Sequence, residues 1–257
     1  MHLTIHAMKI SVCFLLCLLQ MQNVFCQTNV AFCGIKNKTT FSGEVLNYKV
    51  YYTLAGAYFR AGEATFSNTL SVLNHQPVYH VIGSGKTFKN YDWFFKVRDI
   101  YESYLDTATM LPLKFTRNVS EGKNRIYNNV QFNQKQGTAL STNGLFEIPP
   151  CIQDVLSAIY YARNIDFNTY KIGDKIPLTL FLDDEVHPIY IRYLGKQKLS
   201  TSSGVYNVIK FRPMLIEGTL FKGGEKMTVY VTDDERKIPI LIETPILVGS
   251  VKVYWVK

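Results

Sequence analysis

The hydrophobic and polar positions along this chain mostly follow the two-residue period of β-strands. In residues 44–54, Leu46, Tyr48, Val50 and Tyr52 alternate with polar side chains and would share one face of a strand. Turn-forming residues separate this segment from others of the same kind. These further predicted strands are residues 63–72, 77–85, 97–105, 112–118, 124–132, 176–182, 188–193, 204–212, 226–232, 239–243 and 247–255. Residues 55–62 and 136–143 are predicted to be a turn and a loop.

One segment has helical periodicity instead. Pro149 and Pro150 suit the first turn of a helix, where a backbone N–H has no intrahelical partner. We therefore expect a helix over about residues 150–163, packed against or wrapped by a curved sheet. Four apolar residues at i, i+3, i+4 and i+7 would form its buried stripe: Ile152, Val155, Leu156 and Ile159. The predicted fold class is mainly β, a single curved antiparallel sheet or open β-barrel with this central helix.

The predicted helix also carries a polar seam, formed by Asp154, Ser157, Tyr161 and Arg163. Asp154 and Arg163 are nine positions apart, about 13 Å of helix rise, so they cannot pair with each other. We expect an arginine or tyrosine of the sheet beside Asp154 and an acidic residue beside Arg163. Two interpretations remain open: a buried network that fixes the helix register, or part of a ligand-binding pocket. Catalysis by Ser157 would need a histidine base that the sequence does not visibly supply.

The first 26 residues are typical of a signal peptide. Lys9 precedes an apolar run, residues 10–19, that is too short to span a bilayer. We expect cleavage after Cys26, with residues 27–257 forming one exported domain. The alternative is a lipoprotein in which Cys26 is acylated. No later segment is long and apolar enough to be a predicted transmembrane helix.

Two cysteines lie outside the signal peptide, Cys33 and Cys151. In an exported chain they are compatible with a disulfide, and two separate buried thiols are the alternative. The histidines after the signal peptide, His75, His80 and His187, lack the spacing of metal ligands. We therefore predict neither a metal site nor a cofactor.

Three segments give the chain a family resemblance: GEVLNYKVYY at residues 43–52, IQDVLSAIYYARN at 152–164 and VTDDERKIPILIETPILVGSVKV at 231–253. They resemble the exported bacterial family known as domain of unknown function 3108, over residues 43 to 255. The sequence style is similar to that of Bacteroidetes members. The resemblance implies export and a curved antiparallel sheet packed with a helix, and it implies no particular activity.

The composition disfavours some classes of function but does not indicate a particular reaction. The net charge is +8, but the basic residues are scattered, which disfavours nucleic-acid binding. Aromatic residues make up 14% of the chain, enough to line a wide sheet. We expect a periplasmic or secreted protein, or one peripheral to the outer membrane. Its expected role is non-enzymatic: binding a lipid or glycolipid, or contacting other envelope proteins. The alternatives are a glycan-active hydrolase, which needs two acids roughly 5–10 Å apart, and a scaffold without a ligand cavity.

Overall fold

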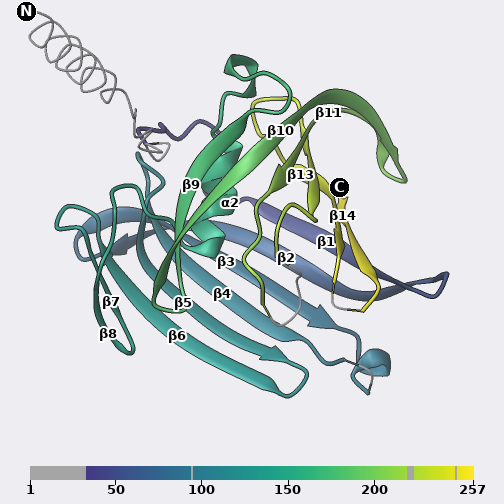
Figure 1. Cartoon of the computed structure of the whole chain (residues 1–257), viewed down its shortest axis with the longest axis horizontal. Coiled ribbons are helices and arrows are strands. Elements are labelled where there is room, and N and C mark those ends of the chain that lie inside the picture. Colours follow the sequence, from purple (N-terminus) through teal and green to yellow (C-terminus); the bar gives the residue numbers. More distant parts are fainter. Residues whose placement is uncertain (1–32, 94, 219–222, 247) are drawn as a thin grey trace, which may run out of the picture. The chain divides into compact units, whose positions relative to one another are not determined.

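The computed structural model describes residues 33–93, 95–218, 223–246 and 248–257. The predicted signal peptide, residues 1–26, lies outside these described residues, and so does the expected cleavage site. The unit formed by the described residues is built from one antiparallel sheet and one α-helix, α2 (Figure 1).

The sheet has fourteen strands in the order β8-β7-β6-β5-β4-β3-β2-β1-β14-β13-β12-β11-β10-β9. The first and last strands of the chain, β1 and β14, are therefore neighbours in the middle of the sheet. The edge strands β8 and β9 do not pair with each other within the described residues, so the sheet is open. The strands are β1 (Val45–Leu54), β2 (Ala57–Leu73), β3 (Gln76–Thr87), β4 (Arg98–Asp106), β5 (Pro112–Glu121), β6 (Asn124–Asn133), β7 (Thr138–Ser141), β8 (Gly144–Glu147), β9 (Lys175–Leu182), β10 (Glu185–Thr201), β11 (Gly204–Pro213), β12 (Thr228–Thr232), β13 (Pro239–Pro245) and β14 (Ser250–Val256).

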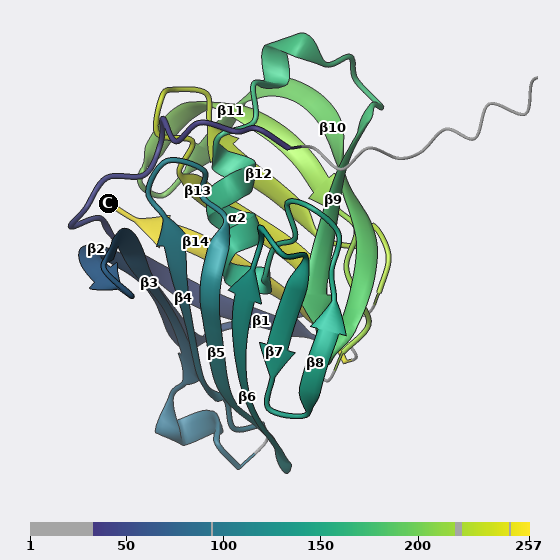
Figure 2. The ribbon, with the colours of Figure 1, turned by 90° about the vertical axis from the view of Figure 1, so that its left-hand side faces the viewer.

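The sheet curves so that strands far apart in its order face each other (Figure 2). Helix α2 (Val155–Arg163) contacts both β4 and β9, which lie nine positions apart in the sheet. Contact with both is possible only if the sheet bends around the helix. Gly83 of β3 allows a close approach, because a Cβ atom there would lie 3.3 Å from Leu156 Cδ1. The predicted fold class is confirmed.

Two short segments differ from the prediction. Residues 55–62 were expected to be a turn, but only Ala55 and Gly56 turn, both with positive φ (47° and 84°), and β2 begins at Ala57. A two-residue turn of this kind matches the twist of a hairpin. The predicted loop at 136–143 contains strand β7, which pairs with β6 and β8. Its short polar sequence carries little periodicity, so pairing with neighbours decides its conformation.

The helix is shorter than the predicted 150–163, because it begins at Val155. The preceding residues pair with the edge of β9 instead. The Gln153 N–H donates to Thr179 O at 2.9 Å, and Phe181 N donates to Gln153 O at 2.8 Å. A backbone held extended in this way cannot also form the first helical turn, so the prolines precede the helix rather than begin it.

Two residues of the predicted apolar stripe, Val155 and Leu156, pack against the core, and the other two do not belong to the buried face of the helix. Ile152 is fully buried but lies before the helix, and the side chain of Ile159 is 40% exposed. The buried face instead runs through Leu156 and Tyr160, which are 2% and 1% exposed. The helix therefore packs on a face rotated from the one that simple apolar periodicity indicated.

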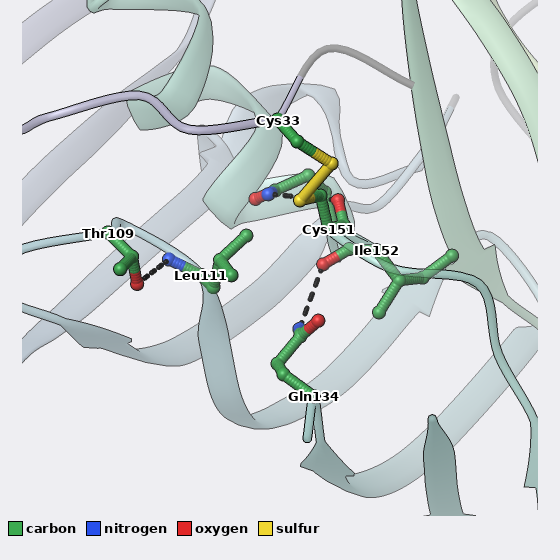
Figure 3. The surroundings of a disulfide bond; sticks show 7 residues. Cys33, Thr109, Leu111, Gln134, Cys151 and Ile152 are labelled. Atoms are coloured by element: carbon green, nitrogen blue, oxygen red, sulfur yellow. Dashed lines mark hydrogen bonds between the residues drawn. A yellow bond between two sulfur atoms is a disulfide. The ribbon is translucent and has the colours of Figure 1, made fainter. Parts of the chain in front are cut away.

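A disulfide joins Cys33 to Cys151, with 5.7 Å between their Cα atoms. It connects the segment before β1 to the turn before α2 (Figure 3). In the same region Gln134 Nε2 donates to Ile152 O at 3.1 Å. Of the two alternatives for the cysteines, the structure has the bonded pair.

Candidate functional site

The N-terminal end of the polar seam is a helix cap. Asp154 Oδ1 accepts hydrogen bonds from Leu156 N at 2.8 Å and Ser157 N at 2.7 Å. Ser157 Oγ in turn accepts from Asp154 N at 2.8 Å, which completes a capping box. Ser103 Oγ on β4 donates to Asp154 Oδ2 at 2.6 Å. The partner of Asp154 is thus a serine, in place of the expected arginine or tyrosine.

The cap is completely buried, and this burial determines the pKa of Asp154. Desolvation raises the pKa of Asp154 to about 6, against the hydrogen bonds from Ser103 and the helix amides, which lower it. The Ser157 hydroxyl donates to Asp154 O at 3.1 Å. Both hydrogen bonds of Ser157 are therefore used inside the cap, and the hydroxyl is not positioned as a nucleophile.

The C-terminal end of the polar seam is a buried ion pair. Arg163 binds both carboxylate oxygens of Glu44, at 2.6 and 2.9 Å, and its guanidinium also donates to Arg236 O and Thr39 O. Arg236 Nη2 is a second cation on Glu44, at 2.9 Å. Burial alone would raise the pKa of Glu44, but the two arginines hold it below its usual value. The acidic partner of Arg163 thus comes from the segment just before β1.

Tyr161 completes the polar seam. It is 1% exposed, and its hydroxyl is hydrogen-bonded to the backbone of Ile35. Burial raises the pKa of Tyr161 to about 12. The structure therefore brings Asp154 and Ser157 together at one end of α2, and it places Tyr161 and Arg163 against the segment before β1. The four side chains do not converge on one point.

A second polar group lies on the inner face of β4 and β5, and the sequence interpretation missed it. Asp99, Arg117 and Glu121 form this concave polar cluster. Alternation along the strands puts Asp99 on the same face as Ser103, which touches the helix cap, and Arg117 on the same face as the buried Phe115.

The carboxyl groups of Asp99 and Glu121 lie within hydrogen-bonding reach of each other, so the two can share a proton. Burial and the Asp99 carboxylate raise the pKa of Glu121 to about 7, and burial also raises that of Asp99. Ser120 N donates to Asp99 Oδ1 at 3.0 Å, which favours Asp99 as the ionised member. Hydrogen-bonded carboxyls are too close for the roughly 5–10 Å separation that glycoside hydrolysis requires.

Arg117 is the cation of the concave polar cluster, and it is 6% exposed. Its Nη2 forms an ion pair with Asp183 in the turn that joins the edge strand β9 to β10. Its Nε has no hydrogen-bond partner among the described residues, which is unusual for a buried donor. Burial lowers the pKa of Arg117.

The inner face also carries apolar side chains that are only partly buried. Five side chains from several strands pack against the core that contains α2 while keeping part of their surface exposed. These residues, the apolar wall, are Phe66, Tyr101, Ile189, Met227 and Ile242. Gly85, next to Asp99 in the pairing of β3 with β4, has open space where a side chain would project.

The model of the family described as protein of unknown function, DUF3108, matches residues 47–256. The chain belongs to this family. No curated protein matches it. A solved structure with a similar fold is a beta-barrel-like protein of domain of unknown function DUF1849 from Brucella abortus, with a TM-score of 0.55. It is 8% identical, and the match covers 87% of this chain and 98% of that one. At this identity the similarity concerns the fold alone.

Other features of this DUF3108 chain concern ions and membranes. Within the described ranges, no three His, Cys, Asp or Glu side chains are grouped so as to hold a metal ion. None of the helices in the part of the chain that the structure describes is long and apolar enough to cross a membrane.

One feature of the sequence could have identified the concave polar cluster of this DUF3108 chain. Asp99 and Glu121 occupy the strand positions whose neighbours at i±2 are inward-facing, such as Tyr101 and Val119. A charged residue at an inward position is a departure from the pattern and marks a candidate site. The pairing of β4 with β5, which brings the two carboxyls together, has no local signature.

Proposed function

We propose that this DUF3108 protein is an exported, non-catalytic protein of the cell envelope that binds an apolar or amphipathic ligand on its concave face. The observation that carries the proposal is the apolar wall. Its residues come from strands as distant in the sheet as β4 and β10, yet all pack on one core and keep part of their surface exposed. Apolar surface that faces inward from opposite sides is the lining expected for a lipid or glycolipid.

The two alternatives find less support. A hydrolase would need two separated carboxylates or a free nucleophile. The carboxyls of Asp99 and Glu121 lie within hydrogen-bonding reach of each other. The Ser157 hydroxyl already donates and accepts a hydrogen bond within the helix cap. A scaffold without a ligand would gain nothing from leaving part of Ile189, Met227 and Ile242 exposed on the inner face. These side chains favour an occupant of complementary, apolar character.

The test is native mass spectrometry of the protein purified from its own cell envelope. We expect a co-purifying lipid, and we expect its loss in Ile242→Glu, which puts a charge on the apolar wall. The matched control is Ile100→Glu on β4, because Ile100 is 47% exposed and adjacent to Tyr101 on the opposite face. Both variants must show wild-type circular dichroism. A ligand-free wild-type protein, or equal retention of lipid by both variants, would refute binding on the concave face.

Export is a separate part of the proposal, supported by the basic start and the short apolar run of residues 1–26. N-terminal sequencing of the protein recovered from the cell envelope should begin at Gln27. Retention of the apolar start would contradict cleavage and export, and a lipid on Cys26 would show a lipoprotein instead.

A further inference from the structure

We infer that the concave polar cluster is the subsite for a neutral, hydroxyl-bearing head group, such as glycerol or a sugar, on the ligand that the apolar wall holds. The inference rests on the proposed function and deepens it. Asp99, Arg117 and Glu121 lie on the same inner face as Tyr101, a member of the apolar wall, and Tyr101 is the cross-strand partner of Arg117. A ligand on the wall therefore has a polar boundary directly beside its apolar surface.

The unpartnered donor points to a ligand. Arg117 is more than nine-tenths buried, its Nη2 is occupied by Asp183, and its Nε has no acceptor among the described residues. Glu121 Oε2 is also buried and accepts no hydrogen bond from an N–H or hydroxyl group of the described residues, and the Glu121 carboxyl lies beside that of Asp99. The site thus offers the unpartnered Nε–H of Arg117 next to a carboxyl pair. Buried polar atoms of this kind are normally satisfied by a hydrogen bond.

The charges exclude ionic head groups. Arg117 is already neutralised by Asp183, and Asp99 adds a negative charge, so a carboxylate or phosphate would be repelled. An ammonium group would suit the carboxyls but offers no acceptor to Arg117 Nε. A hydroxyl both donates and accepts, so it satisfies the carboxyl pair and the arginine together.

There is also room for a head group beside these side chains. Gly85 of β3 pairs with Asp99 of β4, and Ala64 of β2 pairs with Gly85. A side chain built at Gly85 would meet no atom within 4 Å, so the inner face is open at this point. Small residues therefore border the cluster on the side of β2 and β3, and a head group placed at Gly85 would lie next to Asp99.

Four amphiphiles that share a twelve-carbon chain separate the possibilities: monododecanoylglycerol, dodecyl glucoside, dodecanoate and dodecylamine. Titration calorimetry with the oxidised full chain, below micelle concentrations, should give a dissociation constant at least about tenfold lower for a hydroxyl-bearing compound than for either charged one. The tighter of the glycerol and sugar compounds identifies the source of the head group. Equal affinity for all four would overturn the head-group inference and leave the proposed function standing. Binding by none would overturn the proposed function itself.

Variants at Glu121 test the cluster directly. Glu121→Gln keeps a carbonyl acceptor and an N–H that can donate to Asp99, so the preference for hydroxyl heads should persist. Glu121→Leu removes both, so the preference should fall by about tenfold while the dodecyl chain still binds. Asn118→Ala is the matched control, because Asn118 is exposed on the outer face of the same strand. Identical preference in the Gln and Leu variants, both folded by circular dichroism, would refute the assignment.

Discussion

Replacing Arg163 by alanine tests whether the buried ion pair at the end of α2 holds the fold together. The Arg163 and Glu44 side chains are 2% and 4% exposed, so the variant leaves a carboxylate that water cannot reach. Loss of one partner from a buried pair costs about 3–5 kcal/mol. Arg236 stays within 2.9 Å of Glu44 but is half-exposed, so it offsets part of this loss. We expect a decrease of about 3 kcal/mol in the free energy of unfolding.

Urea denaturation of the oxidised protein at pH 7 measures this change, and the double variant Arg163→Met with Glu44→Leu is the control. It removes both charges and should recover much of the loss. Because the arginines hold the pKa of Glu44 below 4.5, the pair's contribution is complete above that pH and is lost as the pH falls through the folded-state pKa. A loss below about 1 kcal/mol in Arg163→Ala, or one that does not diminish in acid, would refute a structural ion pair.

Three further perturbations probe the helix and its attachments. Reducing the disulfide, or replacing Cys33 and Cys151 by serine, should lower the free energy of unfolding by up to about 5 kcal/mol, since it closes a span of 118 residues; an unchanged urea midpoint would contradict this. Leu156→Ala should cost about 2–5 kcal/mol, whereas Ile159→Ala, at a position 40% exposed, should cost less than about 1 kcal/mol; equal losses would mean that the helix packs on another face. Asp154→Asn retains the acceptor for the helix amides but removes a carboxyl whose folded-state pKa is raised to about 6. Between about pH 4 and 6 the unfolded chain releases this proton first, so the wild type should lose stability as the pH rises and the variant should lose less. Parallel curves of melting temperature against pH would refute that role.

Local pattern predicts most of this fold. Strand β1 follows the alternation of Leu46, Tyr48 and Tyr52, all of which are buried. Alternation succeeds because a strand in an antiparallel sheet has one face on the core and the other exposed. It fails at β7, whose four residues are too few and too polar to show a period.

The helix shows where local pattern stops being sufficient. Pro149 and Pro150 are compatible with a helix start. The backbone of Gln153 is hydrogen-bonded to β9, however, so the helix begins only after the N-cap residue Asp154. The partner that completes this cap, Ser103, lies 51 residues earlier in the chain. Contacts at such separation depend on how the sheet curves, and no local window of sequence encodes them.

The buried polar side chains differ in whether other residues of the protein satisfy their hydrogen-bonding groups. Asp154 and Ser157 form hydrogen bonds with each other within the helix cap. Arg163 donates hydrogen bonds to the Glu44 carboxylate and to two backbone carbonyl groups. Groups satisfied so completely have no capacity for a ligand, and they fix the helix against the sheet. Arg117 and Glu121 are also buried, but Arg117 Nε has no acceptor among the described residues and the Glu121 carboxyl has only Asp99 beside it. A fold that tolerates the cost of such atoms retains them where an outside group completes the network. Asp154, Ser157 and Arg163 therefore fix the helix in the core, and Arg117 is the buried strand residue whose free donor we propose that a bound head group completes.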